Sequence, residues 1–254
     1  MYRQTINNYL RSNGFKAFNL KAVLFDMDGV LYDSMPRHVV AWREAMAQNG
    51  IRMTAEDAYA TEGMRGVDTI RLMAKQQLKA DLSEAEAQKI YDLKSKLFHQ
   101  SGEAPLMPHI LELMQQIVAG GVKIGVVTGS GQRPLIARLQ KDFGQFVSPE
   151  HIVTAYDVKR GKPFPDPYLM GMQKIGSMPC ETMVVENAPK GVCSAVAARA
   201  FTVGVNSGPL PDEALKDEGA NLVFASMGDL STAWQQLSTN LAQANKPENC
   251  ENRN

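Results

Sequence analysis

Residues 21–34, with the sequence KAVLFDMDGVLYDS, decide the fold, because an apolar run ends abruptly there in two aspartates. Helical patterns separate four later apolar runs that also end in polar residues: KIGVVTGS (123–130), HIVTAYD (151–157), TMVVEN (182–187) and AFTVGVN (200–206). Near-continuous apolar strands that alternate with helices are typical of a parallel sheet buried on both faces. With the right-handed crossovers that such sheets almost always have, the sequence predicts a doubly wound α/β fold.

The spacing of the first two predicted strands indicates an inserted domain. About 95 residues separate them, although a whole βαβ unit needs only about 30. Helical patterns fill the interval, and Thr54 followed by Asp57 predicts a helix start close to a capping box. The predicted organisation is a Rossmann-like core (20–34 and 104–243), an inserted all-helical cap (35–103), an N-terminal extension (1–19) and a polar tail expected to be disordered (244–254).

Composition limits the classes of partner and compartment. The chain has 254 residues, and its 27 basic residues balance its 27 acidic ones, so no overall field attracts nucleic acid or an anionic membrane. No segment approaches the roughly 18 apolar residues of a membrane span, and the N-terminus lacks a secretory apolar region. Three scattered cysteines suit a reducing compartment. We therefore expect a cytoplasmic protein, monomeric, that binds neither nucleic acid nor membrane.

Polar side chains gather where the predicted strands end. In an open α/β sheet, ligands bind outside the carboxyl ends of the strands. The residues that the sequence places there are Asp26, Asp28, Thr128, Lys162, Glu186 and Asn187. Neighbouring carboxylates repel each other unless a cation lies between them, and an oxygen-rich site favours Mg²⁺. The sequence therefore predicts a magnesium and phosphate site at this edge.

Each residue type in this set suits a step of phosphoryl transfer. Asp26 and Asp28 flank Met27, and a turn at Gly29 lets one carboxylate act as nucleophile and the other as general acid/base. A second group of residues offers hydroxyl and main-chain N–H groups to phosphate oxygens, namely Thr128, Gly129 and Ser130. Lys162 supplies a positive charge against the transferring group.

Four segments together resemble motifs one to four of the haloacid dehalogenase-like superfamily: DMDGVLYDS (26–34), VVTGSG (126–131), GKPFPDPY (161–168) and VVENAPKG (184–191). The helical insert after the first motif is similar to the small cap of its β-phosphoglucomutase-like subfamily. The resemblance implies that Asp26 is the nucleophile, that an aspartyl-phosphate intermediate forms and that Asp28 is the acid/base. It also implies Mg²⁺ held by Asp26, the main-chain carbonyl of Asp28 and the motif-four side chains, Glu186 or Asn187.

Three cap residues bear on the choice between hydrolysis and phosphoryl transfer to a sugar. His38 resembles a cap histidine of β-phosphoglucomutase, and Arg65 lies one position from an arginine that grips the distal phosphate in that enzyme. Glu62, however, stands where the mutase has a lysine, and a carboxylate there repels a second phosphate. We expect His38 and Arg65 to contact substrate and Glu62 to reach the metal or order a water.

These features give a first hypothesis and alternatives. The combination of Glu62 with Glu186–Asn187 resembles the pyrophosphatase-type members of the subfamily, so the leading prediction is a Mg²⁺-dependent phosphohydrolase acting on inorganic pyrophosphate. The alternative is a β-phosphoglucomutase-type isomerase or a sugar-phosphate phosphatase. A catalytically silent phosphate-binding protein is disfavoured, because Asp26, Asp28, Thr128 and Lys162 are all present.

Overall fold

The predicted doubly wound α/β fold with a helical cap is confirmed. The structure, a computed structural model, describes residues 2–130 and 133–244. Within this part of the chain, six parallel strands form one sheet in the order β3-β2-β1-β4-β5-β6. The strands are β1 (Ala22–Phe25), β2 (Lys123–Val127), β3 (Ile152–Val153), β4 (Thr182–Glu186), β5 (Phe201–Val205) and β6 (Leu222–Phe224).

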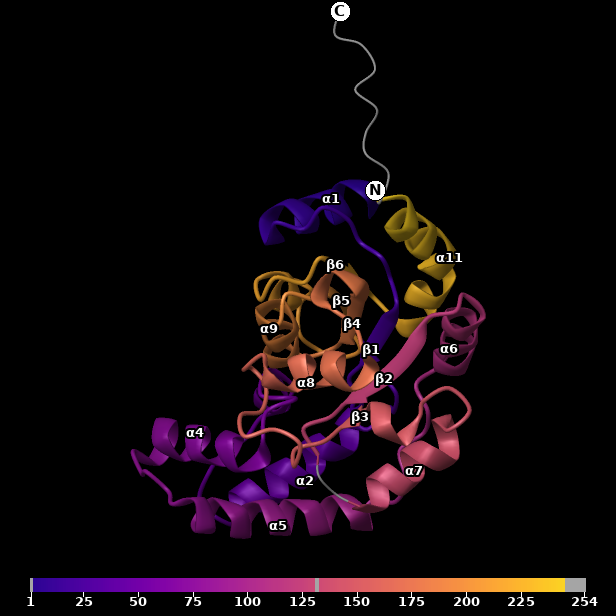
Figure 1. Ribbon diagram of the computed structural model, residues 1–254. Coiled ribbons are helices and arrows are strands. Elements are labelled where there is room, and N and C mark those ends of the chain that lie inside the picture. The colour runs from indigo at the N-terminus through magenta and orange to yellow at the C-terminus, as the bar shows by residue number, and fades with distance from the viewer. Residues whose placement is uncertain (1, 131–132, 245–254) are drawn as a thin grey trace, which may run out of the picture.

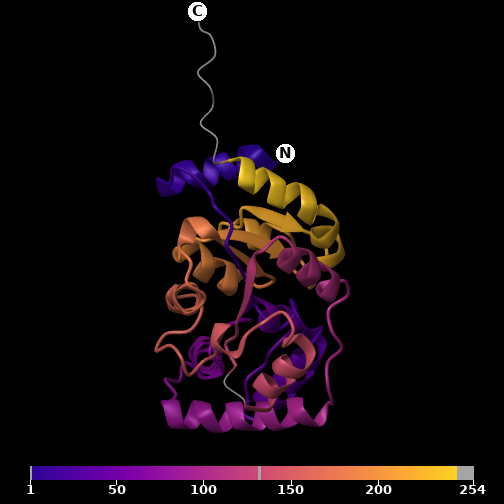
Figure 2. The same ribbon diagram turned by 45° about the vertical axis from the view of Figure 1, so that its right-hand side comes forward.

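Helices cover both faces of the sheet and form the cap (Figures 1 and 2). Those of the core are α1 (Tyr2–Asn13), α6 (Ile110–Ala119), α7 (Arg133–Phe143), α8 (Asp166–Ile175), α9 (Pro189–Ala197), α10 (Glu213–Lys216) and α11 (Met227–Gln243). The cap helices are α2 (Met35–Ala47), α3 (Ala55–Ala60), α4 (Gly66–Leu78) and α5 (Glu84–Gln100). The helices α2, α4 and α5 lie at one end of the molecule, and α1 lies at the opposite end (Figure 1). None of the described helices is long and apolar enough to cross a membrane.

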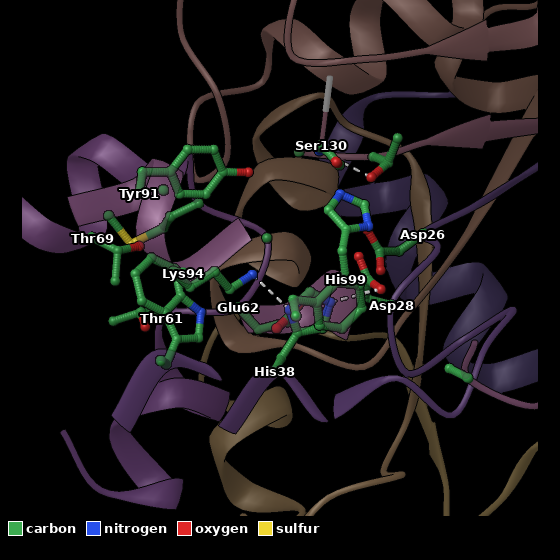
Figure 3. A pocket seen from close by; sticks show the side chains of 18 of the residues that line it. Asp26, Asp28, His38, Thr61, Glu62, Thr69, Tyr91, Lys94, His99 and Ser130 are labelled. Carbon is green, nitrogen blue, oxygen red and sulfur yellow. Dashed lines mark hydrogen bonds and ion pairs between the residues drawn. The ribbon is translucent and has the colours of Figure 1, made fainter. Parts of the chain in front are cut away.

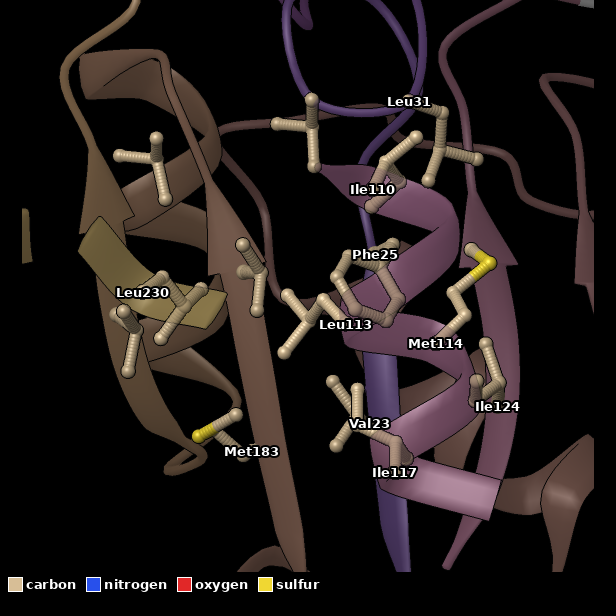
Figure 4. Close-up of a cluster of buried hydrophobic side chains, with 14 of the residues drawn as sticks. Val23, Phe25, Leu31, Ile110, Leu113, Met114, Ile117, Ile124, Met183 and Leu230 are labelled. Carbon is tan, nitrogen blue, oxygen red and sulfur yellow. The ribbon is translucent and has the colours of Figure 1, made fainter. Parts of the chain in front are cut away.

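Alternate side chains of β1 pack on opposite faces of the sheet. Val23 and Phe25 pack under α6 and α11 (Figure 4), whereas Ala22 and Leu24 face α8 and α9. Successive strand residues point to opposite faces, so a strand buried on both must be apolar throughout. Burying each large apolar side chain contributes roughly 1.5–3 kcal/mol. This packing fixes β1 at the centre of the sheet, and its carboxyl end carries Asp26.

The cap has an apolar cluster of its own. Its largest members on α2, α4 and α5 include Trp42, Met46, Ile70, Met73 and Ile90, and α3 contributes to it as well. The helix start predicted at Thr54 is confirmed, because Thr54 and Asp57 make both hydrogen bonds of a capping box.

Two strands differ from the prediction. The segment 151–157 contributes only Ile152–Val153, because the carboxylate of Asp157 accepts hydrogen bonds from the N–H and hydroxyl of Thr154 at 2.7 and 2.8 Å, and these bonds bend the chain. Strand β6 was not predicted, since its three residues are only half-buried and give a weak pattern.

The N-terminal extension contains a packed helix, and the predicted disordered tail lies almost wholly outside the described residues. Ile6, Tyr9 and Leu10 of α1 are buried in the core. The hydroxyl of Tyr9 lies 3.0 Å from the carbonyl oxygen of Pro179 and 2.8 Å from that of Arg199. Residues 2–13 therefore complete the apolar core at the end far from the cap (Figure 1).

Candidate active site

The parallel register brings the ends of β1 and β4 together. Phe25 pairs with Val185, and the N–H of Asp26 donates to the carbonyl of Val185 at 3.0 Å, so Asp26 and Glu186 lie side by side. The chain then turns at Gly29, which has a φ of +81°. A Cβ atom at Gly29 would lie 2.1 Å from Nδ2 of Asn187, so only glycine fits.

Lys162 holds the centre of a buried charge cluster. Its ammonium donates to Oδ1 of Asp26, to Oε1 of Glu186 at 2.6 Å and to the carbonyl of Val127 at 3.2 Å. Burial alone would lower the pKa of Lys162, but the carboxylates of Asp26 and Glu186 raise it, so the ammonium stays charged. Burial raises the pKa of Asp26 to about 8, and Lys162 opposes that rise.

Glu186 is directed to Lys162 rather than toward a metal. Its Oε1 also accepts from the hydroxyl of Tyr168 at 2.7 Å, and Oε2 accepts from the N–H groups of Asn187 and Ala188 at 3.0 and 3.2 Å. Because these donors already use both oxygens, the geometry differs from the expectation that Glu186 is a metal ligand. The motif-four side chain with an uncommitted oxygen is Asn187.

Three buried polar atoms at this edge have no protein partner in the described residues: Oδ2 of Asp26, and Oδ1 and Nδ2 of Asn187. An unpaired buried oxygen costs about 1–3 kcal/mol, so such atoms are typical of a ligand-binding site. Two of these atoms are hard oxygens, one of a carboxylate and one of an amide, which is the ligand type that Mg²⁺ prefers. The described residues contain no group of three or more His, Cys, Asp or Glu able to hold a metal, so a metal here needs amide and main-chain oxygens as well.

Asp28 faces the cap, where it joins a polar chain. Its Oδ1 accepts from the hydroxyl of Ser34 at 2.5 Å and lies 3.0 Å from Nε2 of His38. Burial favours the neutral acid, but His38 and Ser34 lower the pKa of Asp28 below its ordinary value. Nδ1 of His38 lies 2.7 Å from the ammonium of Lys94. A protonated Lys94 donates to Nδ1, which leaves the imidazole proton on Nε2, facing Asp28.

Lys94 is a buried lysine of α5 whose ammonium lies 4.9 Å from the ring centroid of Trp42 and 5.2 Å from that of Phe98. Burial lowers its pKa to about 8, although the carboxylates of Asp28 and Glu62 oppose that shift. In the folded protein Lys94 therefore loses its proton near pH 8. In the unfolded chain a lysine keeps its proton up to an ordinary pKa of about 10.4.

This shift predicts a pH dependence of stability. Between about pH 8 and pH 10.4 the unfolded state binds more protons at Lys94, so the free energy of unfolding should rise with pH, by up to about 3 kcal/mol. Below about pH 8 both states hold the proton, and this dependence is absent. Urea unfolding of the wild type and of Lys94→Met across this range tests the prediction. The difference between their free energies of unfolding should grow with pH. A difference independent of pH would contradict the assignment.

A cavity of about 180 Å³ joins the core and cap residues (Figure 3). Asp26, Asp28, Thr128, Gly129 and Ser130 line it from the core, and His38, Glu62, Trp42, Tyr91, Lys94, Phe98 and His99 line it from the cap. Burial, Asp28 and Asp26 together raise the pKa of Glu62 well above its ordinary value. The N–H of Ser130 donates to Oγ1 of Thr128 at 3.0 Å. The structure therefore brings Glu62 and His38 to the predicted core residues.

Arg65 is not brought into the cavity. Its guanidinium points to Glu84 and to the carbonyl of Lys159 on the outside of the cap. Sequence reasoning also missed Ser34, Tyr168 and Lys94. Lys94 carries a usable signal, because Ala87, Ile90 and Lys94 share the buried face of α5 at helical spacing, and a lysine in an apolar stripe is unusual.

Comparison with known proteins gives one family. Residues 20–199 match the haloacid dehalogenase-like hydrolases. Hexitol phosphatase A of Escherichia coli is 31% identical over 215 residues, which cover 85% of this chain and 95% of that protein. The β-phosphoglucomutase of Bacillus subtilis is 28% identical and covers 85% of this chain and 96% of its own. A solved structure from Bacteroides vulgatus, described as a candidate β-phosphoglucomutase, is 44% identical with a TM-score of 0.91, covering 94% and 98% of the two chains.

Three observations lead to one conclusion. The sheet edge carries paired aspartates and a buried lysine, the family match covers more than two thirds of the chain, and the relatives include a phosphatase and a phosphomutase. The chain is an enzyme of the haloacid dehalogenase-like hydrolase family.

Proposed function

We propose that the protein is a Mg²⁺-dependent phosphohydrolase that works through an aspartyl-phosphate on Asp26. The observation that carries this proposal is the state of the Asp26 carboxylate, with Oδ1 held by Lys162 and Oδ2 buried without a partner among the described residues. Lys162 orients the carboxylate and stabilises charge that develops on the transferring phosphoryl group. The main-chain N–H of Gly129 and the hydroxyls of Thr128 and Ser130 would hold the phosphate oxygens. The N–H of Thr128 already donates to the carbonyl of Val153 at 2.9 Å, and that of Ser130 to Oγ1 of Thr128 at 3.0 Å.

Asp28 is the proposed acid/base. It is ionised in the arrangement described above, which suits removal of a proton from the water that hydrolyses the aspartyl-phosphate. For the first half of the reaction it must give a proton to the leaving group. His38 is neutral in this arrangement, so its Nε2 proton, 3.0 Å from Asp28, can pass to Asp28 only as the Lys94 ammonium, 2.7 Å from Nδ1, gives a proton to that atom. Lys94, His38 and Asp28 would therefore supply this proton together, and the proton taken from the attacking water would restore it.

Asp26, Asn187 and the main-chain carbonyl of Asp28 are the proposed holders of Mg²⁺. The bound ion would neutralise charge so that an anionic nucleophile and an anionic phosphate can approach each other. Because Asn187 is neutral, this set has one carboxylate fewer than an Asp at that position would give. A second carboxylate, that of Glu62, enters the site from the cap.

The charge of this set predicts the effect of Asn187→Asp. The added negative charge should tighten Mg²⁺ roughly tenfold, about 1.4 kcal/mol in binding free energy, and should reduce the dependence of activity on Glu62. Titration of activity and isothermal calorimetry with Mg²⁺ measure the change. An unchanged Mg²⁺ affinity would remove Asn187 from the metal set.

The relatives favour a phosphorylated polyol or sugar over pyrophosphate, which was the leading prediction from the sequence. Relatives that match most of this chain are named a hexitol phosphatase and a β-phosphoglucomutase. The cavity wall formed by Trp42, Tyr91 and Phe98 also suits the carbon face of such a leaving group. Hydrolysis is favoured over isomerisation, because Arg65 lies outside the cavity and Lys94 is already bonded to His38.

Pyrophosphate is the second candidate, and Glu62 favours it. A cap carboxylate beside Asp26 and Asp28 repels an anionic leaving group unless a cation or proton intervenes, and pyrophosphate arrives as a Mg²⁺ complex. The same carboxylate can also accept a hydrogen bond from a sugar hydroxyl, so the kinetics of a Glu62 variant must decide between the two substrates.

Replacing Glu62 separates the two substrates. We expect Glu62→Ala to lower kcat/KM by about tenfold or more, since removal of a group that completes an active site typically costs at least this much. The exposed Glu56→Ala on the neighbouring α3 is the matched control. A loss confined to pyrophosphate supports the second candidate, and a loss confined to polyol phosphates supports the first. Wild-type kinetics on every substrate would leave Glu62 without a role.

A phosphate-release screen tests the proposed function. The panel contains hexitol phosphates, hexose 1- and 6-phosphates, phosphoglycolate and pyrophosphate, each with Mg²⁺ and with a chelator. Release that requires Mg²⁺, with no conversion of glucose 1-phosphate to glucose 6-phosphate when a bisphosphate primer is added, is the expected result. Isomerisation without net release would support the mutase instead.

A further inference from the structure

The cap touches the core through a short loop at residues 61–65, called here the cap loop. Met64 of this loop forms an isolated parallel bridge with Lys162. A Cβ atom on Gly129 would lie 2.9 Å from the carbonyl oxygen of Gly63, and one on Gly63 would lie 2.9 Å from Cδ of Lys162. Both distances leave no room for a side chain, so the cap loop lies directly against the backbone and lysine of the site.

Arg65 extends this contact to the segment that ends in Lys162, residues 159–162, called here the lysine loop. Its Nη1 donates to the carbonyl of Lys159 at 3.4 Å, while Nη2 donates to Glu84 of α5 at 3.2 Å. A Cβ atom on Gly161 would lie 2.7 Å from Cγ of Arg65, so the side chain lies flat on the lysine loop. One guanidinium thus joins a cap helix to a core loop.

The lysine loop has few other restraints in the described residues. The side chain of Arg160 pairs with Asp166 at the start of α8, and the N–H of Phe164 donates to the carbonyl of Gly161 at 3.0 Å. Both contacts are local in sequence. The contacts that hold the lysine loop from elsewhere in the described chain come from the Lys162 ammonium within the site and from Met64 and Arg65 of the cap loop.

We propose that Arg65 is a positioning residue, which on cap closure fixes the lysine loop and thereby sets the Lys162 ammonium against Asp26. This inference rests on the proposed function for the role of Lys162. Arg65 acts through the main chain of Lys159, and it does not touch the substrate. When the cap closes, the charge cluster of Asp26, Lys162 and Glu186 is then completed at the same time.

We expect the loss of the Arg65 side chain to change kcat rather than the stability of the fold. The guanidinium is partly exposed, and pairs of that kind contribute at most about 1 kcal/mol, which corresponds to about a fivefold change in an equilibrium. We therefore expect Arg65→Ala to lower kcat about fivefold with little change in KM or in the melting temperature. A substrate-binding Arg65 would instead raise KM.

The test combines hydrogen exchange with kinetics on the full chain. In Arg65→Ala, the amides of residues 159–162 should exchange about fivefold faster than in the wild type, whereas the exposed Arg71→Ala of the adjoining helix α4 should leave them unchanged. Arg65→Lys, which keeps a donor for the carbonyl of Lys159, should restore most of kcat, and added guanidinium ion should partly rescue Arg65→Ala.

Two outcomes overturn the proposal. Unchanged exchange in the lysine loop of Arg65→Ala would show that Arg65 does not hold it. A raised KM with unchanged kcat would make Arg65 a substrate-binding residue. Exchange needs no substrate, so faster exchange in Arg65→Ala together with an inactive wild type would retain the positioning role and reject only the proposed function.

Discussion

Asp26→Asn is expected to abolish phosphate release, with a loss of roughly 10⁴-fold or more, because an amide cannot form the aspartyl-phosphate. The fold should survive the change. Burial raises the pKa of Asp26, so the carboxylate charge is costly where it lies, and Asn has almost the same shape. Lys162 keeps Glu186 as a partner at 2.6 Å.

The measurement is phosphate release together with far-ultraviolet circular dichroism and the melting temperature. Asp33→Asn, an exposed change in the same loop, is the control that should retain activity. Substantial turnover by a well-folded Asp26→Asn protein would remove Asp26 as the nucleophile and with it the proposed mechanism.

Lys162→Met is expected to cost both activity and stability. Removing the ammonium leaves the carboxylates of Asp26 and Glu186 buried together without a counter-charge. Breaking a buried pair in this way typically costs about 3–5 kcal/mol. Loss of a charge that stabilises the transferring group should lower kcat by about 10²–10³-fold.

A second substitution separates the two effects. Lys162→Met combined with Glu186→Gln removes one of the unpaired charges, so part of the lost stability should return, as measured by urea unfolding. Activity should not return, since the positive charge beside Asp26 is still missing. Recovery of activity in the double variant would mean that Lys162 serves only to neutralise Glu186.

The core could be predicted from the sequence because its signals are local. Each central strand is an apolar run that ends in a reactive residue, so the order of residues along the chain is enough to place Asp26, Thr128 and Asn187 at one edge of the sheet. Strand β6 gave no such signal, because its residues are only half-buried. Periodicity detects burial, and a short strand at the edge of a sheet has little of it.

The cap contacts could not be predicted, because they depend on how distant segments meet. Lys94 lies 56 residues from its partner His38, and only the packing of α2 against α5 brings them together. The direction of the Glu186 side chain is set by Tyr168 and by main-chain N–H groups, which a strand pattern does not report. Arg65 was assigned to substrate by its place in a motif, whereas the cap loop turns its side chain toward the lysine loop.

The charges of the site explain why closure matters. In the closed arrangement Asp26, Asp28 and Glu62 face one cavity, and burial together with their mutual repulsion raises the pKa of Glu62. Such a group of carboxyl side chains favours the binding of a proton or a cation. The proposed Mg²⁺ and substrate would therefore stabilise the closed cap, and the open cap would release product.

The most direct test of the proposed mechanism is to trap the phosphoryl group on the enzyme. The wild type is mixed with Mg²⁺ and the fastest substrate of the panel, quenched in acid within milliseconds, digested and examined by mass spectrometry. We predict one phosphoryl group on the peptide that contains Asp26, formed during turnover and absent from Asp26→Asn. Steady phosphate release with no phosphorylated peptide, or with the phosphoryl group on His38, would contradict the proposed mechanism.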